Sequence, residues 1–148
     1  MAATRWLLLL AAMAVTVNAV ANYRLPGDIV PKHYDLKILT HLDQASNFTF
    51  IGTVRIQMDV LKETKAITLH QQQLMIHENS VKVLNDKRSI PVTNITYDES
   101  VNFMTVHVGE VLKPGQSYDL SISFTGFLKE NLVGFYRSSY KDSATGND

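Results

Sequence analysis

The clearest pattern in this sequence is a long alternation of apolar and polar residues over residues 48–62. Successive side chains of a β-strand point to opposite faces, so this alternation predicts a strand with one apolar face and one mostly polar face. A strand of this length needs partners along its edges and a cover for its apolar face. The apolar face consists of Phe48, Phe50, Gly52, Val54, Ile56, Met58 and Val60.

Two other segments, residues 34–42 and 118–124, alternate almost as clearly and are the best candidates to pair or pack with this strand. A polar connection at residues 41–47 joins the first segment to the long strand, which predicts an antiparallel hairpin or meander. Residues 22–32 are expected to form a linker, because prolines and a glycine interrupt them. The apolar sides of the two segments consist of Tyr34, Leu36, Ile38 and Leu42, and of Tyr118, Leu120, Ile122 and Phe124.

Shorter strands are predicted at residues 66–70, 74–77, 81–84, 90–97 and 103–112. Turns are predicted at residues 85–88 and at residues 113–116, where proline and glycine occupy the two central positions. No window of helical length has apolar residues at three- and four-residue spacing. About eight strands separated by turns predict an all-β fold in one domain, either an antiparallel β-sandwich or a saddle-shaped pair of sheets.

Residues 1–21 are predicted to be a secretory signal peptide. Arg5 supplies the positively charged start, residues 6–15 the apolar stretch, and residues 17–19 or 19–21 the cleavage site with small side chains. The alternative is a membrane anchor, but a helix needs about 20 apolar residues to cross a bilayer, and this stretch has about half that. We therefore expect a mature domain at residues 22–148 in the secretory pathway, and finally outside the cell or at its surface.

Charge and composition exclude several classes of function. The formal net charge is +0 and the basic residues form no run or stripe, so we expect no nucleic-acid partner. With 0 cysteines there is no disulfide framework, no thiolate metal site and no cysteine nucleophile. No second apolar stretch follows Val20, so we expect no membrane span on this chain.

One short run suggests metal chemistry. His77-Glu78 begins like the zinc motif HExxH, but Val81 stands where the second histidine is required. That motif also needs a helix, whereas this run lies between predicted strands, so we expect His77 to be a surface histidine. The remaining histidines lie on separate segments without a partner at ligand spacing, and we expect ordinary strand or loop residues at His33, His41, His70 and His107.

Two N-glycosylation sequons are present, Asn47-Phe48-Thr49 and Asn94-Ile95-Thr96. In a chain that enters the secretory pathway, both asparagines are candidate acceptors of N-glycans. Asn47 lies at the start of the long strand and is expected to be the more accessible. Asn94 lies within a strand pattern, where it is either accessible or occluded.

Five groups of residues follow one another in a familiar order over residues 23–140. They are Tyr23-Arg24-Leu25-Pro26 with residues 29–36, Phe50-x-Gly52-x-Val54-x-Ile56, Thr64-x-x-Ile67-x-Leu69-His70 with Leu74-x-Ile76, Leu112-x-Pro114-Gly115-x-x-Tyr118-x-Leu120-x-Ile122-x-Phe124-x-Gly126, and Gly134-Phe135-Tyr136-Arg137-Ser138-Ser139-Tyr140. Taken together, they resemble the opening of the aminopeptidase N family of zinc metallopeptidases. Within this pattern, Gly52 is interpreted as a β-bulge or a close approach of the backbone.

The resemblance implies the N-terminal β-saddle domain of those enzymes. In the family, zinc is held by HExxH and a downstream glutamate, and a GAMEN loop binds the amino terminus of the substrate; both belong to the following catalytic domain. The family's N-terminal domain contributes mainly a glutamine, which would fall after Asp148. The resemblance therefore places no catalytic, substrate-binding or metal-binding residue on this chain. Zinc and peptide substrates would be bound only through the catalytic domain.

Three hypotheses of function follow. The leading one is a fragment of a secreted or cell-surface aminopeptidase N-like protein, itself inactive. The second is a standalone, secreted, non-catalytic β-sandwich binding module. The third, less favoured, is an enzyme of another type that uses the scattered histidines.

Overall fold

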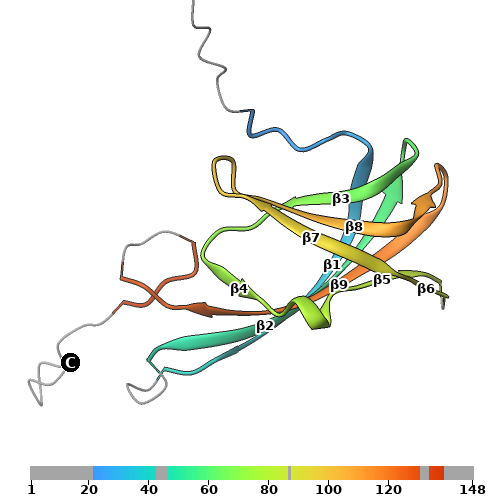
Figure 1. The fold of residues 1–148 in the computed structure, drawn as a ribbon. Helices are drawn as coiled ribbons and strands as arrows, with labels where there is room; N and C mark the ends of the chain where they lie inside the picture. Colours follow the sequence, from blue (N-terminus) through green and yellow to red (C-terminus); the bar gives the residue numbers. More distant parts are fainter. Residues whose placement is uncertain (1–21, 43–46, 87, 131–133, 139–148) are drawn as a thin grey trace, which may run out of the picture.

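The computed structural model describes residues 22–42, 47–86, 88–130 and 134–138. These residues form nine β-strands and one short 3-10 helix, arranged in two antiparallel sheets (Figure 1). The all-β prediction is therefore confirmed. The expected signal peptide at residues 1–21 lies outside the described residues.

The larger sheet has the order β1-β2-β9-β5-β6, and β4 also pairs with β9. Its central strands β2 and β9 pair over their whole length, with Val54 opposite Ile122, and β1 pairs with the other edge of β2. The two segments expected to accompany the long strand are thus its two neighbours. The bounds of these strands are Ile29–Thr40 for β1, Thr49–Val60 for β2, Leu74–Ile76 for β4, Lys82–Asn85 for β5, Arg88–Ile90 for β6 and Ser117–Phe127 for β9.

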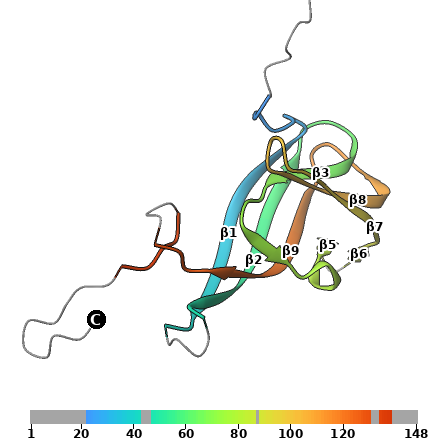
Figure 2. The same ribbon diagram turned by 60° about the vertical axis from the view of Figure 1, so that its left-hand side comes forward.

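The smaller sheet has the order β3-β8-β7. Figures 1 and 2 show that it lies across one end of the larger sheet, while the β1–β2 hairpin extends away from it. A single 3-10 turn, η1, follows β4 at Glu78–Ser80. The strands of this sheet are β3 (Thr64–His70), β7 (Val92–Asp98) and β8 (Phe103–Leu112).

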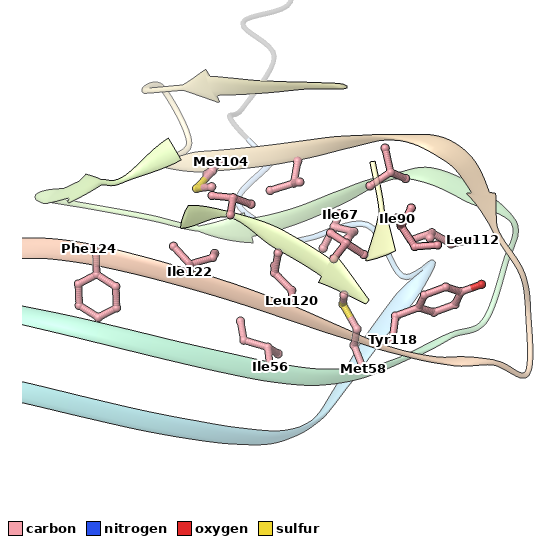
Figure 3. Packing of buried hydrophobic residues seen from close by; sticks show 14 of the residues in the cluster. Ile56, Met58, Ile67, Ile90, Met104, Leu112, Tyr118, Leu120, Ile122 and Phe124 are labelled. Atoms are coloured by element: carbon pink, nitrogen blue, oxygen red, sulfur yellow. The ribbon is translucent and has the colours of Figure 1, made fainter. Parts of the chain in front are cut away.

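The hydrophobic core fills the space between the two sheets (Figure 3). It is built from the apolar faces that the alternation predicted: Met58 of β2, Leu120 of β9 and Met104 of β8 are almost completely buried. Burying one such side chain stabilises the fold by about 1.5–3 kcal/mol. Alternation therefore identified the inward positions of β2, β8 and β9 correctly.

The first strand begins earlier than predicted. Residues 22–32 were expected to be a linker, yet β1 starts at Ile29 and runs through Pro31, with a bulge between Pro31 and His33. Proline is tolerated here because β1 is the outermost strand of its sheet, where a missing N–H need not remove a bond of the ladder. The expectation of a linker is correct only for residues 22–28.

The strand predicted at residues 90–97 is in fact two strands in different sheets. β6 ends at Ile90 in the larger sheet, and β7 begins at Val92 in the smaller one. Pro91 separates them because it has no N–H to donate, although its carbonyl accepts a bond from Gly109 N at 2.9 Å. Pro91 is therefore the point at which the chain crosses from one sheet to the other.

The two predicted turns are present. Asp86, between β5 and β6, has a φ of 53°, and Gly115, between β8 and β9, has a φ of 75°. Positive φ at the third position of a turn that has proline second is typical of a type II turn, which favours glycine there. The bounds of β8, residues 103–112, are also as predicted.

Candidate functional site

The structure places the HExx-like run at the end of β4, on the surface. His77 is exposed and its Nε2 lies 3.0 Å from Oγ1 of Thr125. Glu78 Oε1 accepts a 3.0 Å hydrogen bond from the Tyr97 hydroxyl, and burial together with this carboxylate raises the pKa of Tyr97 to about 12. Val81, at the position of the missing second histidine, points into the core with 7% exposure. These positions therefore do not face a common point, as ligands of one metal must.

The other histidines lie apart from one another. His33 pairs with Asp35 at 3.2 Å, the His70 ring packs against Phe103 with centroids 4.9 Å apart, and His107 Nε2 lies 3.0 Å from Thr96 Oγ1. Within the described residues, there is no group of three or more His, Cys, Asp or Glu side chains that could hold a metal ion.

Both sequon asparagines have exposed side chains. Asn47 lies in the connection between β1 and β2, in the left-handed region with φ 55°. Asn94 lies on β7, one of the two outer strands of the smaller sheet. The hydroxyl of its sequon, that of Thr96, lies close to His107. Glycosylation at either residue stays a prediction, since exposure is necessary for a glycan but does not establish one.

An apolar groove lies where the smaller sheet leaves the larger one uncovered. We call it the open groove; it has a volume of about 350 Å³ and adjoins the core. On β1, Tyr34 and Leu36 are each 56% exposed, although their side chains point to the same side as the buried residues of β2. The groove offers mainly apolar area for binding, and His70 and Gln71 are the polar members of its lining. It is lined in part by Tyr34, Leu36, Val54, Ile56, Ile122 and Phe124.

The opposite face of the larger sheet carries an ion pair that links β2 to β9. Arg55 Nη2 donates to Asp119 Oδ2 at 2.8 Å, and this hydrogen bond is the main cause that raises the pKa of Arg55. Asp119 is only 8% exposed, and its second oxygen, Oδ1, is buried without a hydrogen-bond partner among the described residues. A polar hollow beside this pair is lined by Asp35, Lys37, Lys82 and Ser121, among others.

Sequence reasoning did not find this ion pair. The two residues are 64 positions apart, and each looks like an ordinary polar-face residue of its own strand. Only the pairing of β2 with β9 brings them together. The register of two strands distant in sequence was not predicted, so no signal in the sequence indicated the pair.

Comparison with known proteins agrees with the all-β domain. Residues 30–148 match the Peptidase M1 N-terminal domain, and this chain belongs to that family. It is 36% identical over 118 residues to Aminopeptidase 2 of Candida albicans, a match that covers 80% of this chain and 12% of that protein. It is 26% identical over 128 residues to Aminopeptidase N of Bos taurus, a match that covers 82% of this chain and 13% of that protein.

A third relative is the thyrotropin-releasing hormone-degrading ectoenzyme of Rattus norvegicus, 28% identical over 119 residues, covering 79% of this chain and 11% of the relative. The chain therefore spans about an eighth of the length of the proteins it matches. The resemblance inferred from the five motifs is confirmed.

None of the helices in the described residues is long and apolar enough to span a bilayer.

Proposed function

We propose that this chain is the N-terminal β region of a zinc metalloaminopeptidase that removes N-terminal residues from peptides outside the cell. The observation that carries this proposal is the match of residues 30–148 to the Peptidase M1 N-terminal domain. Two of the relatives matched over about four-fifths of this chain are aminopeptidases by name. Activity, peptide substrates and zinc would belong to the whole protein.

The residues described here do not fit a zinc site. Val81 lies in the core where the motif needs a ligand, and the described residues offer no cluster of three ligands. By the family resemblance, zinc binding and catalysis would belong to the catalytic domain. The region described here would then act as a scaffold, with the open groove on one face of its larger sheet and a polar hollow on the opposite face.

Two experiments test the proposal. The transcript downstream of codon 148 should encode both the GAMEN and the HExxH sequences in frame, and their absence from every transcript would contradict the assignment to a peptidase. The 148-residue chain, purified after expression, should not turn over an aminoacyl chromogenic substrate with or without added zinc. Turnover that a chelator abolishes would show that the chain itself carries the chemistry.

The proposed location is the secretory pathway, ending outside the cell or at its surface. The supports are the signal-like residues 1–21, the two exposed sequon asparagines, and a relative named as an ectoenzyme. Secretion of the chain into the medium of eukaryotic cells, with loss of residues 1–21 from the product, is the expected result. Retention in the cytosol with an intact Met1 would contradict it.

A second function, a secreted non-catalytic binding module, is favoured by one observation. The open groove presents apolar side chains to solvent, including Tyr34 and Leu36 at 56% exposure each. Exposed apolar surface of this kind is typical of interaction sites. This alternative predicts transcripts that end at codon 148 and a soluble, monodisperse product; transcripts that all continue into a catalytic domain would remove its basis.

A further inference from the structure

The outer edge of β1 is the longest unpaired strand edge among the described residues. β1 has 12 residues and stands at the end of the larger sheet, where β2 occupies only one of its two edges. Such an edge presents a row of free N–H and C=O groups, which is a template for another strand. The question is which strand would fit it.

The hydrogen bonds to β2 identify the residues that face outward. The amide of His41, directly after β1, donates to Thr49 O at 2.8 Å, and the pairing has no register shift between His33 and Thr40. Alternate residues of a strand direct their N–H and C=O groups to opposite edges. The even-numbered residues from Tyr34 to Thr40 therefore direct theirs to the free edge.

We propose that β1 pairs in an antiparallel arrangement with β1 of a second copy of this chain, centred on Leu36. In this register Leu36 faces the partner's Leu36, and Tyr34 faces the partner's Ile38. These pairs join outward-facing residues to outward-facing residues, as an antiparallel ladder requires. The result is a symmetric dimer in which both larger sheets form one continuous sheet.

Charge selects this register over its neighbours. With Leu36 at the centre, Asp35 lies opposite the partner's Lys37 and Lys37 lies opposite the partner's Asp35. If the pairing were centred on Asp35, that residue would face the partner's Asp35. If it were centred on Lys37, that residue would face the partner's Lys37. Directly opposed like charges are destabilising, whereas opposite charges are stabilising.

The geometry of the odd-numbered residues strengthens these charge pairs. Asp35 and Lys37 direct their backbone groups toward β2, so across the new edge they would form non-hydrogen-bonded pairs, in which side chains lie closest. Asp35 also contacts His33 at 3.2 Å on the same face. Within the larger sheet Asp35 also lies opposite Arg55 of β2, and its second carboxylate oxygen would face the lysine of the other copy.

The apolar face supplies the second half of the fit. Tyr34, Leu36 and Ile38 are 56%, 56% and 42% exposed, although they share one side of β1. In the dimer they would meet the partner's Ile38, Leu36 and Tyr34 side by side, and aromatic–β-branched pairs of this kind stabilise sheets. The two open grooves would then form one apolar surface that crosses the dimer.

The ends of β1 limit the pairing to residues 32–40. At the N-terminal end, Pro31 has no N–H, and the bulge between Pro31 and His33 bends the strand. In the proposed register Pro31 lies opposite the partner's His41, which has already left the strand. The ladder between the two copies therefore ends at symmetry-related positions, where residue 32 of one copy faces residue 40 of the other. This favours a closed dimer over an open fibre.

A charge-swap experiment tests this register: the full 148-residue sequence is expressed in eukaryotic cells, and the purified product is studied by sedimentation equilibrium. Asp35→Lys places two lysines opposite each other, and Lys37→Glu places two carboxylates opposite each other. The dimer dissociation constant of each variant alone should be about tenfold larger than that of the wild type. An equimolar mixture of the two should recover the dimer, because in the mixed dimer each substituted side chain faces a side chain of opposite charge.

The mixture also controls for folding, since only folded variants can form the mixed dimer. Lys113→Glu, in the β8–β9 turn, makes the same change of charge as Lys37→Glu and should leave dimerisation unchanged. A wild-type chain that stays monomeric at every concentration would overturn the proposal and leave the edge to a strand of another polypeptide. Dimers of Asp35→Lys or Lys37→Glu as stable as the wild type would overturn the register.

Discussion

Phe124 of β9 lies with its ring over Gly52 of β2, so close that a Cβ on residue 52 would stand 2.3 Å from two ring carbons. The neighbouring pair is arranged in the reverse sense, with Phe50 of β2 over Gly126 of β9. The two rings contact each other edge to face at 6.4 Å. Each strand thus carries Phe-x-Gly, and the glycines make room for the rings of the opposite strand.

This arrangement decides between the two interpretations of Gly52. No register shift interrupts β2 at Gly52 on either edge, so the glycine does not mark a bulge. It marks a close approach, as the second interpretation held, although the approaching group is an aromatic ring and not a backbone. Aromatic side chains that cover glycines across a sheet stabilise the pairing of the strands.

The first prediction concerns this contact. Gly52→Ala should destabilise the domain by about 1–3 kcal/mol, because the added methyl group overlaps the packed ring of Phe124. Urea unfolding followed by circular dichroism measures the effect. Gly27→Ala is the matched control, since no atom lies within 4 Å of its added Cβ, and its effect should stay within about 0.5 kcal/mol.

A double variant separates steric overlap from other causes. Phe124→Leu removes the ring, so Gly52→Ala should cost much less in that background than in the wild type. Equal costs of Gly52→Ala in the two backgrounds would show that the ring is not the obstacle.

The second prediction concerns Arg55 and Asp119. Arg55→Ala should lower the urea midpoint, because it leaves a carboxylate with 8% exposure without its cation. Asp119→Asn in the Arg55→Ala background should restore part of the loss by removing the buried charge. Lys62→Ala is the matched control, since its pair with Asp28 spans 3.8 Å between more exposed side chains. A midpoint for Arg55→Ala equal to that of the control would contradict the prediction.

The third prediction is a pH dependence that arises from Asp59. A hydrogen bond from Ser117, followed by the contact with Lys32, holds the pKa of Asp59 below its ordinary value of 3.8. A lowered pKa in the folded state means that the charged form stabilises the fold above pH 3.8, and that this contribution is lost as the pH falls. Asp59→Asn should therefore lower the unfolding midpoint at pH 7 but leave it nearly unchanged at about pH 2.

Thermal unfolding at several pH values measures this dependence. Glu99→Gln, an exposed turn residue, serves as the charge-matched control. A destabilisation by Asp59→Asn of the same size at pH 7 and at about pH 2 would mean that its carboxylate charge plays no part.

The fourth prediction concerns N-glycans. Because Asn47 and Asn94 are both exposed, the secreted chain should carry up to two glycans. Asn47→Gln and Asn94→Gln should each lower the apparent mass on a gel by the mass of one glycan. Treatment with a glycosidase should collapse all forms to a single band. Thr49→Ala and Thr96→Ala provide matched controls that keep the asparagines. A wild-type chain that the glycosidase does not shift would contradict the prediction.

Alternation predicted the interior of this fold well, because inward and outward positions in strands follow directly from a period of two. The faces of β2, β8 and β9 were assigned correctly for that reason. The same pattern could not show that Tyr34 and Leu36 lack a cover, since alternation identifies an apolar face without identifying what packs on it. The cover depends on where the smaller sheet lies.

Prolines caused the errors in strand bounds. Pro31 lies inside β1, where a linker was predicted, and Pro91 lies between two strands of different sheets, where one continuous strand was predicted. What differs is the neighbour of each missing N–H, which depends on tertiary structure. The absence of a catalytic group on this chain was expected from the resemblance alone, and it stays an expectation.

The position of β9 also sets the order of events during synthesis. β9 is the last strand of the described chain to leave the ribosome, yet it occupies the middle of the larger sheet between β2 and β5. The inner edge of β2 must therefore wait, exposed, until all the strands from β3 to β8 have been made. Contacts this distant in sequence form slowly and leave the growing chain open to aggregation. A nascent chain halted before β9 would lack the strand that joins both halves of the sheet.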